Sequence, residues 1–138
     1  MIIDYHTGIF DNLRDLMLKI TAVQSAMANI KTKDTTPENL RALFEANSDP
    51  FKSTSQSFDS YTVQLTRIDN AEAQESIDII NEANKIIDTY RILQSQITTL
   101  SFVELKNQYE QLRQKAVMLE RLARFRWKNM SGQYGNQK

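Results

Sequence analysis

The sequence predicts an all-α protein, a helical bundle with a long C-terminal antiparallel helical hairpin that packs like a coiled coil. Three observations predict this class. The 138 residues include only three glycines and two prolines, so long stretches contain no residue that ends a helix. Apolar residues recur at alternating spacings of three and four, which keeps them on one helix face. A helix-start pattern near residue 101 separates two such stretches by a turn too short for anything but an antiparallel return.

The first predicted helix spans 8–31. Its apolar row, which we call a seam, comprises Ile9, Leu13, Leu16, Ile20, Val23, Met27 and Ile30. Residues 1–7 are expected to form a flexible end. A short helix over 37–46 follows, because Thr36 can cap a helix whose first residue is Pro37.

The next predicted element is one long or kinked helix over 50–98. Its first part carries Phe51, Phe58, Tyr61, Leu65 and Ile68 at helical spacing, although its many serines and threonines lower the helix propensity. A new helix could start within 69–72, but nothing there forbids helix, and continuation is favoured. A regular seam follows, formed by Ile79, Ala83, Ile86, Tyr90, Leu93, Ile97 and Leu100.

The last predicted helix spans 102–129. Ser101 and Glu104 have the spacing of a capping box, and Leu100 and Leu105 occupy the positions of a hydrophobic staple. The glycines and serine after this helix are expected to release a flexible end over 131–138. The seam of this helix is Leu105, Tyr109, Leu112, Ala116, Leu119 and Ala123.

Folding the two seams together gives layers of matched size. The predicted pairs are Leu93 with Leu105, Tyr90 with Tyr109, Ile86 with Leu112, Ala83 with Ala116, and Ile79 with Leu119. Each arm would be about 42 Å long against about 35 Å for the first helix. Apolar residues outside the seams then need cover, so we expect self-association or a protein partner.

The composition removes many kinds of active site. The absence of cysteine excludes thiolate nucleophiles and thiolate metal sites, and the single histidine, His6, excludes sites built on several imidazoles. Gly8, Gly132 and Gly135 do not form a phosphate-binding loop. No catalytic, cofactor-binding or metal-binding residue is therefore assigned, and no cofactor is expected. His6 is expected to be exposed in a frayed terminus, and Tyr90 and Tyr109 to be packing residues.

Charge is balanced overall but unevenly distributed. Residues 34–88 carry eleven acidic and four basic residues, whereas residues 102–138 carry eight basic and three acidic ones. The antiparallel register would bring an acidic row, formed by Glu72, Glu75, Asp78 and Glu82, alongside a basic, aromatic turn. Because no histidine accompanies the acidic row, a solvated, ion-paired face is favoured over a cation site. The basic turn, a candidate contact for a partner or nucleic acid, comprises Arg121, Arg124, Phe125, Arg126, Trp127 and Lys128.

These features favour a non-enzymatic structural or interaction subunit of a larger assembly, such as a phage particle or a secretion apparatus. Its expected partners are further copies of itself, other proteins of the assembly, or both. The alternatives are a helical adaptor or chaperone, and an accessory nucleic-acid-binding protein that uses the basic turn. No cleavable signal or apolar span is recognisable, so the protein is expected in the cytoplasm or in an assembled particle; export without a cleaved signal stays open.

Overall fold

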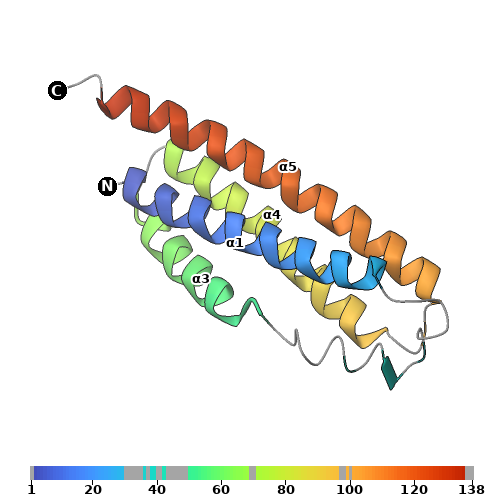
Figure 1. Ribbon diagram of the computed structural model, residues 1–138. Helices are drawn as coiled ribbons and strands as arrows, with labels where there is room; N and C mark the ends of the chain where they lie inside the picture. Colours follow the sequence, from blue (N-terminus) through green and yellow to red (C-terminus); the bar gives the residue numbers. More distant parts are fainter. Residues whose placement is uncertain are drawn as a thin grey trace.

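A computed structural model describes residues 2–29, 36, 38–39, 42, 50–68, 71–96, 99 and 101–135. This part of the chain is all-α, without a strand, as the sequence predicts. Four long helices form a bundle: α1 (Ile2–Ala28), α3 (Lys52–Thr66), α4 (Ala71–Ser95) and α5 (Phe102–Gly135) (Figure 1).

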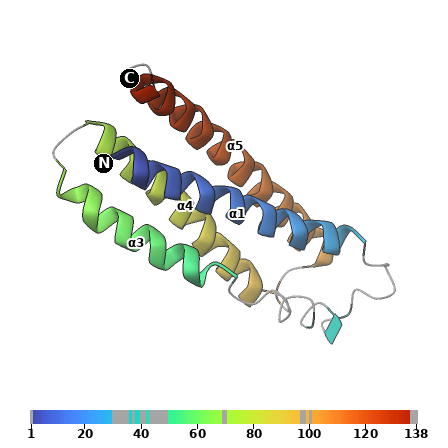
Figure 2. The same cartoon turned by 60° about the vertical axis from the view of Figure 1, so that its left-hand side comes forward.

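Successive helices of the bundle run in opposite directions (Figures 1 and 2). α1 and α4 run one way, and α3 and α5 run the other way. Each helix packs against its neighbours in the order α1, α5, α4, α3 and back to α1, and the most extensive contact joins α1 to α5. The buried apolar side chains of all four helices form a single core.

Helix α1 begins earlier than the sequence predicts. The expected start at residue 8, after a flexible end over 1–7, is wrong, because the helix starts at Ile2 and His6 is fully buried. Its seam residues from Ile9 to Met27 are buried as a continuous row, and Tyr5 packs against the core edge. The burial of side chains ahead of Ile9 explains the extension, since helices are stabilised mainly by tertiary packing.

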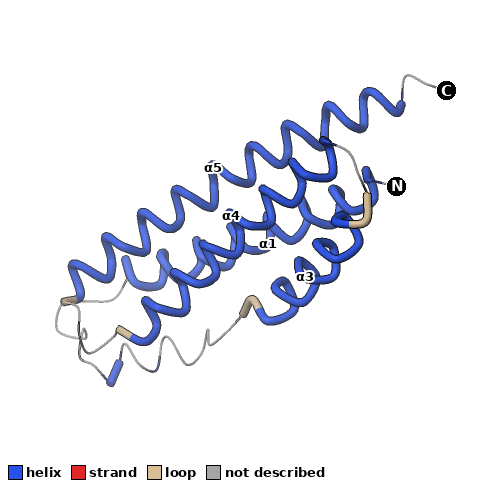
Figure 3. Tube along the Cα trace, turned by 180° about the vertical axis from the view of Figure 1, so that it is seen from behind, coloured by secondary structure: helices blue, strands red, loops and turns tan. Residues whose placement is uncertain are grey.

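The expected single long or kinked helix over 50–98 is also wrong. α3 ends at Thr66, where the N–H of Ile68 donates to the carbonyl of Leu65 in a tight last turn (3.0 Å), and α4 then runs back along α3 (Figure 3). A single helix of that length would extend about 73 Å, against about 40 Å for α1. The reversal instead places Phe58 and Ile80 in one core.

The N-terminal cap predicted for helix α5 is observed in part. The Glu104 N–H donates to Ser101 Oγ (3.2 Å), and Leu105 is buried beneath it. Leu100, the other half of the predicted staple, lies outside the described residues, as do Ile30 and Ile97. The helix continues to Gly135, so the expected flexible end over 131–138 is wrong for residues 131–135.

The predicted short helix over 37–46 lies mostly outside the described residues. Glu38, Asn39 and Ala42 are helical, and Thr36 Oγ1 accepts a hydrogen bond from the Asn39 N–H (3.2 Å), as the predicted cap requires.

An aromatic cluster joins three helices in the core. The Tyr90 ring meets Phe51 edge-on at 4.9 Å between ring centres and Tyr109 edge-on at 5.9 Å. Tyr90 on α4 therefore lies level with Tyr109 on α5. Burial, and next the neighbouring Tyr90, raises the pKa of the Tyr109 hydroxyl far above its ordinary value, so the Tyr109 ring is a neutral packing group.

Candidate protein-interaction surface

The predicted seam residues of α4 and α5 lie in the core rather than on a surface. All ten are buried, with exposed fractions of at most 8%: Ile79, Ala83, Ile86, Tyr90, Leu93, Leu105, Tyr109, Leu112, Ala116 and Leu119. These side chains determine how α4 and α5 pack against each other. Only the surfaces of α4 and α5 beside this buried row are accessible from outside.

One such surface is an open groove between α4 and α5, which we call the α4–α5 groove. Its main part has a volume of about 560 Å³, and a second part of about 280 Å³ continues it toward the start of α4. Glu82, Leu119 and Leu122 line both parts, so the groove is continuous. The other lining residues are Lys85, Ile86, Thr89, Leu112, Lys115 and Met118 in the main part, and Glu75, Asp78, Ile79 and Arg126 in the second.

The α5 wall of this groove is apolar and exposed. Met118 is 69% exposed and Leu122 is 51% exposed, while Ile86 and Leu119 beneath them are nearly buried. Phe125, 64% exposed, follows Met118 by seven residues and so lies on the same helix face. These three side chains form an exposed apolar stripe on α5.

The α4 wall of the groove is acidic. Glu75, Asp78 and Glu82 line it, and Lys85 forms an ion pair with Glu82 at 3.0 Å. These carboxylates belong to the predicted acidic row. In the part of the chain that the structure describes, no group of three or more metal-binding side chains is placed to hold an ion.

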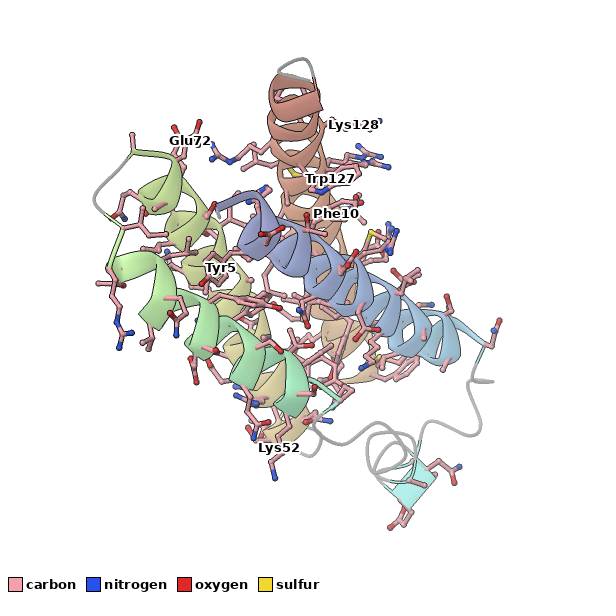
Figure 4. The ribbon with its side chains drawn as sticks, turned by 90° about the vertical axis from the view of Figure 1, so that its left-hand side faces the viewer. Tyr5, Phe10, Lys52, Glu72, Trp127 and Lys128 are labelled. Carbon is pink, nitrogen blue, oxygen red and sulfur yellow. The ribbon has the colours of Figure 1, made fainter. Side chains whose placement is uncertain are left out.

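The basic turn near the end of α5 is divided between two environments. Arg126 forms an ion pair with Glu75, and its side chain is only 19% exposed. Trp127 lies against α1: its Nε1–H donates to Thr7 Oγ1 (2.9 Å), and its ring stacks on Phe10 with 5.6 Å between ring centres (Figure 4). Both residues therefore stabilise the bundle, and four members of the turn stay exposed: Arg121, Arg124, Phe125 and Lys128.

The charge pairing expected across the hairpin includes the pair formed by Arg126 and Glu75. This pair joins α5 to α4. Arg124 instead contacts Glu120 of its own helix at 3.6 Å. Glu72 and Lys128 lie at the same end of the bundle (Figure 4).

His6 is the site residue that the sequence interpretation misplaces. It is buried, with Nδ1 3.1 Å from Ser76 Oγ on α4 and Nε2 3.1 Å from the Ala123 carbonyl on α5. Because a carbonyl only accepts, Nε2 carries the proton, and the neutral ring accepts the Ser76 hydroxyl proton at Nδ1. Burial lowers the pKa of His6 and Arg126 lowers it further, while the bond to the Ala123 carbonyl opposes both. The sequence contains one signal of this burial, because His6 lies three residues before Ile9, at the spacing of the α1 seam.

None of the described helices combines the length and apolar character needed to cross a membrane. Comparison of the chain with protein-family models, curated proteins and solved structures finds no match.

Proposed function

We propose that the protein is a non-enzymatic structural or interaction subunit of a larger protein assembly and associates through the α4–α5 groove. The observation that carries this proposal is the exposed apolar wall of the groove, where Met118 and Leu122 are each more than half exposed. Burying a Leu or Met side chain contributes about 1.5–3 kcal/mol, so a partner that covers this wall gains directly from doing so.

The shape of the groove suits another helix. Helices α4 and α5 lie side by side as two ridges, and between them is an apolar floor that includes Ile86 and Leu119. An amphipathic helix laid between them would contact the floor through residues spaced three and four apart, a recurring mode of recognition. The acidic α4 wall would select a partner with basic residues on that flank.

The proposal includes the packing of α4 and α5 as a coiled-coil-like hairpin that presents the groove. The edge-on contact of Tyr90 with Tyr109 supports the layered register, and so does the burial of residues of matched size at the neighbouring positions. A rigid hairpin would hold both walls at a fixed separation, which lowers the entropy cost of binding a partner.

We propose a phage particle or a secretion apparatus as examples of such an assembly, and an adaptor or chaperone role would use the same groove. All of these roles are compatible with a location in the cytoplasm or in an assembled particle. They share one requirement, which is that a protein partner covers Leu122.

The test is site-specific photo-crosslinking in cells that produce the protein naturally. A photoreactive residue replaces Leu122 in one variant and Val63 in a matched control, since both native side chains are 51% exposed and Val63 lies on α3. We expect a protein adduct of defined mass from position 122 only. No defined adduct at 122, or equal adducts at both positions, would contradict the proposal.

One observation favours a second function, nucleic-acid binding. Phe125 is exposed between the exposed cations Arg121, Arg124 and Lys128, and such a group can stack on bases and contact phosphates. The internal use of Arg126 and Trp127 removes two of the six residues first considered.

The two functions differ in their response to salt. A triple variant Arg121→Gln, Arg124→Gln, Lys128→Gln is compared with the control Lys52→Gln, Arg67→Gln, Arg91→Gln, which removes three exposed cations elsewhere. We expect no nucleic-acid binding that weakens steeply with salt in the native protein. Such binding, lost only in the first variant with its mass and melting temperature unchanged, would establish the second function instead.

A further inference from the structure

We propose that the α4–α5 groove binds a second copy of this chain, related to the first by a two-fold axis that runs along the bundle. This inference rests on the proposed function and names the partner of the same groove. A two-fold interface uses the same patch on both copies, so the patch must be complementary to itself in shape and in charge. The groove meets both requirements.

The apolar requirement is met because the exposed apolar wall of the groove lies next to its apolar floor. α5 offers the exposed stripe Met118, Leu122 and Phe125, and the floor next to it includes Ile86 and Leu119. Rotation about an axis along the bundle keeps every helix direction and exchanges the two sides of the groove. The α5 stripe of one copy then lies toward α4 of the other, antiparallel to it, as α5 lies to α4 within one chain.

The charge requirement is met at one level of the groove, by one acidic side chain on α4 and one basic side chain on α5. Glu82 on α4 and Lys115 on α5 line the same part of the groove. The rotation brings Glu82 of each copy to Lys115 of the other, so the interface contains this pair twice. A two-fold axis across the bundle would instead place the acidic α4 wall against the same acidic wall of the other copy, which like-charge repulsion disfavours.

The surface that the groove offers to a second copy is small. The groove extends from Glu75 to Thr89 on α4, about 21 Å at 1.5 Å per residue, and two helices side by side are about 20 Å wide. Such a face amounts to about 400 Å² per copy, or about 800 Å² in all, which is in the range of weak interfaces. We therefore expect a reversible dimer that dissociates on dilution.

The first experiment measures mass by sedimentation equilibrium on the full chain from about 1 to about 500 µM. The weight-average mass should rise from 16.0 kDa toward twice that value as concentration increases. Met118→Gln with Leu122→Gln should weaken association at least about tenfold. The control Leu18→Gln with Val63→Gln alters side chains of similar exposure on α1 and α3 and should leave association unchanged.

The second experiment tests the axis by charge reversal. Glu82→Lys alone places two lysines together at each contact, and Lys115→Glu alone places two glutamates together, so each variant by itself should associate less than the native protein. An equimolar mixture of the two variants restores opposite charges at both contacts of the mixed dimer. We therefore expect the mixture to regain association, with the regain lost in high salt.

The outcomes separate this inference from the proposed function. A mass of 16.0 kDa at every concentration, or a mixture no better than its components, would overturn the two-fold dimer. A Leu122 crosslink to a protein other than this chain, obtained with a monomeric native protein, would overturn the dimer and leave the proposed function standing. A crosslinked band at twice the chain mass, together with recovery in the mixture, would support both.

Discussion

Three consecutive residues near the start of α1 join this helix to the rest of the bundle. His6 bonds to Ser76 and to the Ala123 carbonyl, and Thr7 accepts from the Trp127 indole. Gly8 lies directly against the Tyr61 hydroxyl, so its missing side chain makes room for α3. At this scale, stability depends on a few polar contacts and one close approach, each of which can be tested by itself.

His6 predicts a pH dependence of stability. Its pKa is lowered in the folded protein, so between that pKa and the ordinary value of about 6.5 the unfolded chain binds more protons. The free energy of unfolding should therefore be highest above pH 6.5 and fall below it, by at most about 1.4 kcal/mol per pH unit from this group. Urea unfolding of the native protein and of His6→Gln between pH 7.5 and pH 5 measures the effect; parallel curves would contradict it.

The effect of Gly8→Ala on the stability of the protein should change sign when the Tyr61 ring is removed. Alanine favours helix over glycine by about 1 kcal/mol, but a Cβ at Gly8 would collide with the Tyr61 hydroxyl and lie 2.7 Å from Cζ of that ring. We expect Gly8→Ala to destabilise the native protein by about 1 kcal/mol. In a Tyr61→Ala background the same change should be stabilising. Thermal unfolding of the four proteins decides this, and a stabilising effect in both backgrounds would show that the ring yields freely.

At the scale of whole helices, what the sequence predicts depends on the range of the interactions involved. The alternating apolar spacing depends on local geometry alone, and the predicted all-helical class is confirmed. Whether the chain turns between Thr66 and Ala71 depends on what covers Phe58 and Leu65, which is a tertiary question. Propensity permits helix throughout this stretch, and the shorter bundle selects the turn.

Helix α5 depends on its cap. Removing the Ser101 hydroxyl leaves the Glu104 N–H without its acceptor, so Ser101→Ala should lower the free energy of unfolding by about 0.5–2 kcal/mol. Ser101→Asp retains an acceptor at the same position and should restore most of the loss. Denaturant titration of the three proteins is sufficient, and an unchanged midpoint for Ser101→Ala would show that the cap does not contribute.

At the scale of the whole molecule, the candidate surface is predictable only in part. The residues of the apolar stripe are visible in the sequence as apolar positions outside the α5 seam. Which apolar side chains outside the seam stay exposed is not visible in the sequence. α1 packs against Trp127, whereas Phe125, two residues earlier, is 64% exposed. Likewise, no local pattern distinguishes Arg126, which pairs with Glu75, from its exposed neighbours.

The Arg126–Glu75 pair predicts coupling between α4 and α5. Arg126→Gln and Glu75→Gln should each destabilise the protein, and the double variant should lose less than the two losses combined, with a coupling of about 0.5–1 kcal/mol. Arg126→Gln should also raise the pKa of His6, because the charge of Arg126 helps to lower it. A double-mutant cycle at pH 7, with the His6 ring titrated by NMR, measures both. Strictly additive losses and an unmoved His6 titration would contradict the pairing.

The most extensive helix contact joins the first helix to the last, and this arrangement affects how the chain must fold during synthesis. Trp127 and Thr7 are separated by 120 positions, so the buried face of α1 has no complete cover until α5 has left the ribosome. A nascent chain truncated within α5 would present the seam of α1 to chaperones. Closure of the bundle is thus a late, long-range step, and the emission of Trp127, the single tryptophan, would report the moment at which it occurs.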